Sequence, residues 1–330
     1  MKDTAAVIVT YNRCELLRQN IECLLNQKNA ECDIYVIDNA STDSTPEMVK
    51  SFTDERVHYF STGANLGGAG GFEYGIKRAV EDGYSFVWVM DDDTLPSPAA
   101  LFSLLDAGKS LSNWGALSSA VFWTDGSVCK ANRQKKSLFS FVTDDELRQH
   151  KPLRVKMASF VSLLVKSEAV RKVGLPHGEY FIWTDDYEFT ARISREYDIY
   201  VVPDSRVVHA MKENKKINIA AEIPERLGRY RYVYRNDVHC YRQHGVGGWM
   251  YLAAKFAYTI MNILINSKTE RLSKIKTVIL GYREGFSFKP AIHHVGNLAY
   301  GGHRRKLTAI RISVYASITN APDECGVTAA

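Results

Sequence analysis

The alternation of apolar and polar positions predicts a repeating order of strands and helices over the first hundred residues. Continuous apolar runs that predict buried strands lie at residues 5–10, 33–38, 57–60 and 86–90. Apolar side chains at helical spacing follow the first three runs, at residues 16–25, from residue 44 onward, and after the glycine-rich block 65–71 as far as about residue 82. Strands that alternate with helices through short connections predict a parallel sheet covered by helices on both faces.

The second of these helices begins with a recognisable start signal. Ser44 stands at the predicted N-cap, Pro46 lies in the first turn, and Glu47 follows three residues after Ser44. This spacing predicts a capping box, in which each of the two side chains bonds the other residue's backbone N–H.

The rest of the chain reads as a mixed region followed by helices. Further strands are predicted at residues 116–123, 160–165, 199–202 and 207–209, a helix at 185–196, and a polar, mobile stretch at 132–156. Beyond residue 220 the pattern is helical. We therefore expect an α/β fold with a mostly parallel, Rossmann-like sheet over residues 1–215, divided into halves 1–105 and 106–215. A helical region at 216–317 and a flexible tail at 318–330 complete the expected organisation.

One predicted C-terminal helix, at residues 249–266, is apolar except for one narrow polar stripe. The stripe consists of Lys255, Thr259, Asn262 and Asn266. The helix is too short and too interrupted to read as a membrane span, which needs about 20 apolar residues. Cations follow it at Lys268, Arg271, Lys274 and Lys276. Two interpretations stay open: a helix lying in a membrane interface, or a core helix packed on the remainder of the chain.

Composition and charge narrow the class of protein. The chain has 330 residues, of which 45% are hydrophobic and 24% charged, as in folded soluble proteins. Its six cysteines form no C-x-x-C pair, which argues against a zinc site or a disulfide framework and suits a reducing compartment. The N-terminus shows no signal-peptide pattern, so we expect no secretion.

Positive charge is concentrated in the C-terminal third. From Arg206 onward there are 20 Lys and Arg against 8 Asp and Glu, a net charge of +12, which leaves residues 1–205 at −7. Such a region could face nucleic acid, a membrane surface or a phosphorylated substrate, or be an ordinary solvated basic face.

The most informative polar residues are carboxylates that follow apolar runs. Asp91, Asp92 and Asp93 come directly after the run at 86–90, and Asp38 ends the run at 33–38. Because parallel strands deliver their carboxyl ends to one edge of the sheet, we expect these acids to share the edge where such folds bind ligands. Clustered carboxylates repel one another unless a cation lies between them, so a hard divalent metal is the expected partner. The alternative is a helix N-cap leading into residues 95–98.

A second acidic cluster, Asp185 and Asp186, lies in an aromatic setting after Trp183. One acid of such a pair can orient while the other accepts a proton from an incoming nucleophile, provided that burial or neighbouring charge raises its pKa. The plain alternative is a surface helix that starts with Thr184 as its N-cap. His209, at the end of an apolar strand, offers a nitrogen ligand for an O,O,N metal site, although a single histidine is commonly just a core or surface residue.

Residues 65–71 are rich in glycine. They lack both the Lys-Ser/Thr of a P-loop and the G-x-G-x-x-G of dinucleotide-binding folds. We expect these glycines to let the backbone approach a ligand closely.

Taken in order, several short blocks resemble family 2 glycosyltransferases of the GT-A fold. These blocks are residues 7–13, 36–43, 65–72, 91–93 and 183–188. The N-x-G-G-A-G-G-F block, the triple aspartate and the W-x-D-D-x-E motif are most similar to bacterial galactofuranosyltransferases, and next to rhamnosyltransferases. Two later blocks, at 230–236 and 281–285, also resemble segments that follow the catalytic domain in these enzymes.

The resemblance implies roles for single residues. Asp186 would be the catalytic base, and Asp91, Asp93 and His209 would hold Mn²⁺ or Mg²⁺. The acceptor or sugar site would comprise Trp183, Asp185 and Glu188. The donor nucleotide site would comprise Thr10, Tyr11, Arg13, Asp38, Asn65, Gly67, Gly68, Gly70, Asp91 and Asp92. Residues 1–105 would be the donor-binding half of the catalytic domain, and 106–215 the acceptor half.

The function implied is an inverting, metal-dependent hexosyltransferase of cell-envelope polysaccharide biosynthesis. The donor would be UDP- or dTDP-linked, with UDP-galactofuranose favoured, and the acceptor a growing, lipid-diphosphate-linked glycan. We expect a cytoplasmic protein, peripheral at the inner face of the cell membrane, with an anionic membrane surface but no nucleic acid as partner. The alternatives are a rhamnosyltransferase using dTDP-rhamnose, a UDP-hexose transferase, a nucleotidyltransferase and a non-catalytic sugar-nucleotide-binding module.

Overall fold

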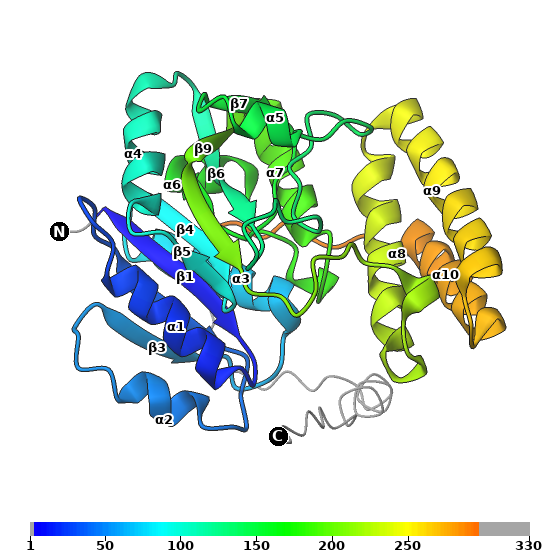
Figure 1. Ribbon diagram of the computed structural model, residues 1–330, viewed down its shortest axis with the longest axis horizontal. Helices are drawn as coiled ribbons and strands as arrows, with labels where there is room; N and C mark the ends of the chain where they lie inside the picture. Colours follow the sequence, from blue (N-terminus) through cyan, green and yellow to red (C-terminus); the bar gives the residue numbers. More distant parts are fainter. Residues whose placement is uncertain (1–2, 297–330) are drawn as a thin grey trace.

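The computed structural model describes residues 3–296. The predicted tail at 318–330 and the last part of the predicted helical region therefore lie outside the described residues. Within residues 3–296, nine strands form one sheet (Figure 1). The strands are β1 (Thr4–Thr10), β2 (Asp33–Asp38), β3 (Val57–Ser61), β4 (Phe86–Asp91), β5 (Thr94–Pro96), β6 (Trp114–Phe122), β7 (Leu153–Val155), β8 (Leu163–Lys166) and β9 (Asp198–His209).

The sheet has the order β3-β2-β1-β4-β8-β6-β9-β5, and β7 pairs with β9 off this path. The first four strands in this order are parallel, and β6 and β9 are also parallel. Strand β8 runs antiparallel to both of its neighbours, β4 and β6. The predicted α/β fold with a mostly parallel sheet is confirmed, and the one sheet crosses both predicted halves of residues 1–215.

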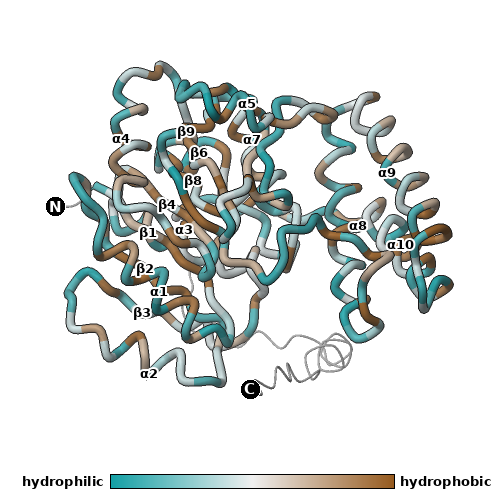
Figure 2. Tube along the Cα trace, viewed as in Figure 1, coloured by the Kyte–Doolittle hydropathy of each residue, from teal (hydrophilic) through white to brown (hydrophobic). Residues whose placement is uncertain are grey.

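Helices cover both faces of the sheet, as the alternation of strands and helices predicts. On β1, Val7 and Val9 pack in one apolar core while Ile8 packs in the other, because successive strand side chains point to opposite faces. Figure 2 shows this apolar character concentrated on the central strands. Helices α3 (Gly67–Glu81), α6 (Ser167–Val173) and α7 (Asp185–Glu196) pack on the first face, and α1 (Cys14–Leu25), α2 (Thr45–Lys50) and α4 (Ala100–Ser110) on the second.

Three local predictions need correction. The capping box of α2 is wrong, because Ser44 makes no side-chain cap bond and Asp43 Oδ1 instead accepts the N–H of Thr45 at 3.0 Å. The strands predicted at 199–202 and 207–209 are one strand, β9, which passes through Pro203 where its register with β6 shifts. The stretch 132–156, expected to be mobile, contains α5 (Asp144–Leu147) and β7 and is packed into the fold, with Gln134 and Lys135 buried.

The C-terminal helices are α8 (Leu227–Arg242), α9 (Gly245–Asn266) and α10 (Arg271–Ser287), and they lie beside the sheet domain (Figure 1). After α10 the chain returns to that domain: Leu175 N–H donates to the His293 carbonyl at 2.7 Å, and His293 Nδ1 contacts Glu73 Oε1 of α3 at 2.5 Å. The chain after α10 thus attaches the C-terminal helices to α3 and to the segment that follows α6.

Helix α9 turns three residues of its polar stripe inward, together with Leu252 and Ile263, and leaves many of its other apolar residues exposed; Asn266, at the end of the stripe, is exposed. Lys255 Nζ contacts Asp237 Oδ2 of α8 at 2.5 Å, and Thr259 is buried. Lys274 of α10, predicted as one of the flanking cations, is buried and donates to the Ala220 carbonyl at 3.0 Å. The exposed large apolar residues of α9 and α10 are Val246, Trp249, Met250, Tyr258, Met261, Leu264, Ile265, Leu272, Ile279 and Phe286. None of the described helices combines the length and the apolar composition that a membrane-spanning helix needs.

Candidate functional site

The carboxyl ends of β1, β2 and β4 meet at one edge of the sheet. Register pairs Thr10 with Asp38 and Val9 with Asp91, so the strand-end acids share the edge that the sequence predicts. The short strand β5 then pairs antiparallel with the end of β9, with Thr94 opposite His209. Residues more than a hundred positions apart in the chain are thereby brought together.

Asp91, Asp93 and His209 form a cluster with ligand atoms all within 4.8 Å of one another. His209 Nε2 lies 2.9 Å from Asp93 Oδ1, and both side chains are buried. Although burial opposes the charged imidazolium, the bond to Asp93 raises the pKa of His209 to about 10. The pKa of Asp93 is lowered to about 2, because the contacts with His209 and Arg13 outweigh the opposing effect of burial.

The cluster fits a divalent cation. Two carboxylates and one imidazole are a donor set suited to Mn²⁺ and acceptable to Mg²⁺. His209 Nδ1 donates to Asn132 Oδ1 at 2.8 Å, so Nε2 is the nitrogen that faces the carboxylates and that would bind a cation after losing its proton. Asn132 was not predicted, since it lies in the polar stretch that gave no ligand spacing.

Asp92 faces β1 instead of the cluster. Thr10 Oγ1 donates to Asp92 Oδ2 at 2.8 Å, and Arg13 Nη1 contacts Asp93 Oδ2 at 2.7 Å and Asp92 Oδ1 at 3.5 Å. Burial raises the pKa of Asp92 to about 7, and burial together with Asp93 raises the pKa of Asp91 to about 6. Three of the predicted donor-site residues, Thr10, Arg13 and Asp92, therefore form one hydrogen-bonded unit.

The other predicted donor residues lie around this edge. Asp38 is fully buried and accepts the Ser41 N–H at 2.9 Å and the Tyr59 hydroxyl at 2.7 Å, so its carboxylate also holds the turn after β2. Tyr11 is exposed. Asn65 Oδ1 accepts the Gly67 N–H at 2.9 Å. Their contacts with a nucleotide remain predictions.

The glycines expected in a ligand-binding loop form the first turns of helix α3. A Cβ on Gly71 would lie 2.5 Å from Val9 Cγ1, and one on Gly67 would meet the carbonyl of Phe181, so these two glycines permit close packing within the protein. A Cβ on Gly70 would lie 2.6 Å from Leu66 Cβ. Only at Gly68, among the predicted glycines, would a Cβ meet nothing within 4 Å.

The second acidic pair begins helix α7. Asp186 is half-buried, and its Oδ1 accepts the N–H of Tyr187 at 2.7 Å. Burial and the charge of Asp91 raise the pKa of Asp186 to about 7, against the opposing effects of the Tyr187 N–H and Lys135. Burial and Asp186 raise the pKa of Asp185 well above its ordinary value. The backbone of Thr184 is in the left-handed conformation, and its side chain makes no hydrogen bond that caps α7. The alternative interpretation, a surface helix capped by Thr184, is therefore wrong.

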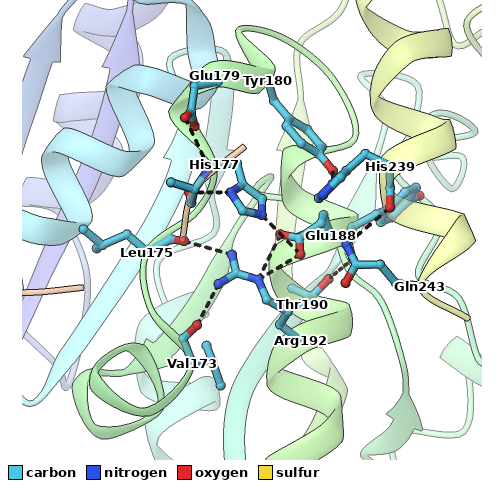
Figure 3. A network of polar contacts seen from close by, with 12 residues as sticks. Val173, Leu175, His177, Glu179, Tyr180, Glu188, Thr190, Arg192, His239 and Gln243 are labelled. Carbon is cyan, nitrogen blue, oxygen red and sulfur yellow. Dashed lines mark hydrogen bonds and ion pairs between the residues drawn. The ribbon is translucent and has the colours of Figure 1, made fainter. Parts of the chain in front are cut away.

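Trp183 and Glu188, the two remaining predicted acceptor residues, have contacts within the protein. Trp183 packs against Tyr230 of α8, with ring centroids 5.3 Å apart. Glu188 is buried, and both of its oxygens accept from Arg192 Nε, at 2.9 and 3.0 Å. Figure 3 shows Glu188, Arg192 and His177 directed at one another, with His177 Nε2 3.6 Å from Glu188 Oε1.

This network fixes α7 in place. Arg192 also donates to the carbonyls of Val173 and Leu175, at 2.7 and 2.8 Å, and thus ties α7 to the chain before it (Figure 3). Although burial opposes ionisation, His177 and Arg192 lower the pKa of Glu188 to about 2. The structure therefore gives Glu188 a part in holding the helix that bears Asp186, and its predicted contact with a sugar stays untested.

Lys135 is another site residue that the sequence did not single out. It is buried, and its Nζ donates to the hydroxyls of Tyr241 at 2.7 Å and Tyr251 at 3.3 Å. The ring of Tyr187 lies 5.0 Å from the same ammonium group. Because its charge lowers the pKa of Asp186, Lys135 is part of the electrostatic setting of the acid pair.

Comparisons with known proteins identify a family and several sequence relatives. The family profile described as Glycosyl transferase family 2 matches residues 5–173. Galactofuranosyltransferase GlfT1 of Mycolicibacterium smegmatis is 29% identical over 198 residues, which cover 58% of this chain and 65% of that protein, just under two thirds of its length. Galactofuranosyltransferase GlfT1 of Mycobacterium tuberculosis is 26% identical over 271 residues, covering 76% of this chain and 89% of that protein.

Two solved structures share the fold at low sequence identity. GalNAc-T7, solved with UDP, GalNAc and Mn²⁺, has a TM-score of 0.59 at 14% identity and covers 87% of this chain and 56% of its own. S. aureus TarS, residues 1–349, has a TM-score of 0.51 at 15% identity and covers 87% of this chain and 72% of its own. The GT-A expectation for the fold is confirmed.

Proposed function

The chain belongs to glycosyl transferase family 2, and from this membership we propose that it transfers galactofuranose from UDP-galactofuranose to a hydroxyl group of a growing glycan. The galactofuranosyltransferase relatives support the choice of sugar. The observation that carries the proposal is the cluster of Asp91, Asp93 and His209 at the sheet edge, within electrostatic reach of Asp186.

In this proposal Asp91, Asp93 and His209 hold Mn²⁺ or Mg²⁺. A divalent ion bound by these residues would neutralise the diphosphate as it leaves the sugar. Asn132 keeps His209 in the tautomer that ligation needs. Arg13 adds a fixed positive charge beside Asp93. The nucleotide itself would be bound by Thr10, Tyr11, Arg13, Asp38, Asn65, Gly67, Gly68, Gly70, Asp91 and Asp92.

Asp186 acts as the general base of a single displacement. Its carboxylate takes the proton of the acceptor hydroxyl while that oxygen bonds to the anomeric carbon. The bond between the anomeric carbon and the diphosphate oxygen breaks on the opposite face, so the anomeric configuration inverts. A carboxylate with a pKa near 7 suits this role, because it is substantially ionised at neutral pH and still basic enough to accept the proton. Asp185 and Trp183 would border the acceptor sugar.

We further propose that the acceptor is lipid-linked and that the enzyme works at an anionic membrane surface, on the cytoplasmic side. The apolar side of α9 faces outward, and its polar stripe is taken up by contacts with α8 and neighbouring residues. Exposed cations, Lys268, Arg271 and Lys276, lie near the end of this apolar side. An exposed apolar surface with adjacent positive charge suits the headgroup region of a bilayer.

A donor screen tests the chemistry. The protein is incubated with UDP-galactofuranose, dTDP-rhamnose and UDP-hexoses in the presence of Mn²⁺, and slow donor hydrolysis and transfer are followed by mass spectrometry. We expect turnover of UDP-galactofuranose that Asp186→Asn abolishes while donor binding is retained. Turnover of dTDP-rhamnose alone would reassign the sugar, and turnover by Asp186→Asn at the wild-type rate would contradict the base assignment.

A further inference from the structure

The segment that leads into the acid pair has a strained backbone. Phe181, Trp183 and Thr184 have φ angles of 65°, 66° and 70°, in the left-handed region that residues other than glycine seldom adopt. Phe181 is the centre of a tight three-residue turn, in which the Ile182 N–H donates to the Tyr180 carbonyl at 2.7 Å. Such a conformation persists only where surrounding contacts impose it.

Asn236 of α8 makes the most concentrated of these contacts. Its side chain is fully buried, and Nδ2 lies within hydrogen-bond distance of three carbonyl oxygens of the segment. These are the carbonyls of Tyr180 at 3.0 Å, Ile182 at 3.0 Å and Trp183 at 2.9 Å. Arg235 Nε donates to Asn236 Oδ1 at 3.0 Å, which sets the direction of the amide. Arg235 also donates to the carbonyls of Glu179 and Tyr180, at 2.7 and 3.1 Å.

The opposite side of the segment contacts the donor half of the site. The Ala69 N–H, in the first turn of α3, donates to the Phe181 carbonyl at 3.1 Å. At the end nearest the acids, Thr184 Oγ1 donates to Asp237 Oδ1 at 3.2 Å, and Asp237 is paired with Lys255. The strained segment therefore lies between the glycine-rich helix and α8, and it ends one residue before Asp185.

We propose that Asn236 is a positioning residue of the transfer reaction. By holding the carbonyls of Tyr180, Ile182 and Trp183, its amide keeps this segment in the strained conformation that directs Trp183 and Asp186 toward the site. This inference rests on the proposed function, in which Trp183 borders the sugar and Asp186 is the base. Asn236 does not touch the reacting atoms and acts through the segment that it holds. The C-terminal helix α8 is accordingly part of the active-site framework.

The decisive variant is Asn236→Ala, and Asn262→Ala on α9 is the control, because it removes a half-buried amide that bonds Asn218 and does not contact the segment. We expect Asn236→Ala to lower kcat for transfer by about 100-fold, because small displacements of reacting groups cost rates of this order. The dissociation constant for UDP, measured by calorimetry, should change little. Asn262→Ala should leave kcat unchanged. If Asn236→Ala does not fold, Asn236→Ser, which keeps one donor, replaces it and should show a smaller loss of the same kind.

A rescue experiment separates positioning from general damage. Glycine adopts the left-handed region without a steric penalty, so Thr184→Gly in the Asn236→Ala background should recover about tenfold of the lost kcat. Thr184→Ser, which keeps the hydroxyl but not the freedom of glycine, should recover nothing. Because Thr184→Gly also removes the hydrogen bond from Thr184 Oγ1 to Asp237 Oδ1, the single variant is measured as the reference for the double variant. A folded Asn236→Ala protein with wild-type kcat, or one that loses UDP affinity as much as kcat and gains nothing from Thr184→Gly, overturns the proposal.

Hydrogen–deuterium exchange distinguishes this failure from failure of the proposed function. Exchange of residues 179–190, followed by mass spectrometry in the absence of any donor, should increase in Asn236→Ala and return toward wild type with Thr184→Gly. This measurement does not depend on the sugar, the acceptor or the role of Asp186. Unchanged exchange shows that Asn236 does not hold the segment, whatever the donor screen finds.

Discussion

At the scale of single residues, the protonation of Asp186 controls the proposed reaction. Burial and Asp91 raise its pKa to about 7, and a general base must be ionised to act. We expect kcat/KM for transfer to rise about tenfold per pH unit below pH 7 and to level off above it. The measurement is a pH–rate profile from pH 5.5 to 9. A rate that is flat across this range would contradict the assignment of Asp186 as base.

The same carboxylate affects folding stability with a definite sign. Its pKa in the folded chain lies above its value in an unfolded chain, so the folded state binds the proton more tightly. The contribution of Asp186 to the free energy of unfolding is therefore fully present below its unfolded pKa of about 4. This contribution is lost as the pH rises through the folded pKa of about 7. Asp186→Asn, which cannot ionise, should unfold at a higher temperature than wild type at pH 8 in metal-free buffer. The difference should shrink at pH 5, and equal unfolding temperatures at both pH values would refute it.

Lys135 should tune this titration through its buried charge. The ammonium group of Lys135 favours the ionised form of Asp186. Lys135→Met should therefore shift the rising limb of the pH–rate profile to higher pH by about one unit. The loss of rate should be about tenfold at pH 6 and small at pH 9. Tyr251→Phe is the matched control, since it removes one hydrogen bond of Lys135 and keeps both the charge and the ring. A uniform loss at every pH would indicate a packing role instead.

The candidate residues that sequence reasoning recovered are those with a local signal. Asp38, Asp91 and Asp93 follow apolar runs, and the rule that parallel strands end at one edge places them together. Asn132 and Lys135 have no such signal, because each acts on residues at least fifty positions away through a side chain that looks ordinary in the sequence. Asn236 ends the block 230–236, but nothing in that block indicates its contacts with residues 180–183. Their roles arise only from the packing of the chain around the site.

At the scale of elements, β9 and α3 show how tertiary contacts override local patterns. Pro203 interrupts the strand pattern and suggests two strands, yet β9 continues because the register shift with β6 falls close to that proline. The glycines of residues 67–71 suggest a loop, yet they are helical, since their missing side chains let α3 lie against β1 and the Phe181 carbonyl. In both cases the neighbouring element, not the local sequence, decides the conformation.

Substitutions within α3 can test this interpretation of its glycines. Gly71→Ala places a Cβ 2.5 Å from Val9 Cγ1, so it should lower the free energy of unfolding by about 1–3 kcal/mol. Gly68→Ala is the matched control, because its Cβ meets nothing within 4 Å and alanine favours a helix over glycine. Denaturant unfolding of the two variants gives the comparison. Equal destabilisation by both would show that the packing of α3 on β1 does not require Gly71.

At the scale of the whole molecule, the C-terminal helices serve both sides of the proposed reaction. Helix α8 contacts the segment before Asp186, the chain after α10 reaches α3, and α9 faces outward. Sequence reasoning left open whether the helix at 249–266 lies in a membrane interface or in a core. Lys255, Thr259 and Asn262 of its polar stripe turn inward beside Leu252 and Ile263, which a hydrophobicity pattern alone cannot reveal, because polar residues are ordinarily expected to face water.

This inverted arrangement makes a specific prediction about membrane binding. The wild-type protein should co-sediment with vesicles that contain anionic lipid and bind weakly to neutral vesicles, since the apolar side of α9 lies near exposed cations and each such cation adds about 1 kcal/mol.

Tyr258→Asp and Ile265→Asp together remove two exposed apolar side chains and add negative charge, so they should abolish sedimentation. Phe102→Asp on α4 adds a negative charge at another exposed apolar residue, outside α9 and α10, and should not affect it. Turnover of a water-soluble acceptor should be equal in all three proteins, because α9 presents these residues away from the site. Sedimentation that is independent of anionic lipid, or unchanged in the double variant, would exclude α9 as the membrane-binding surface.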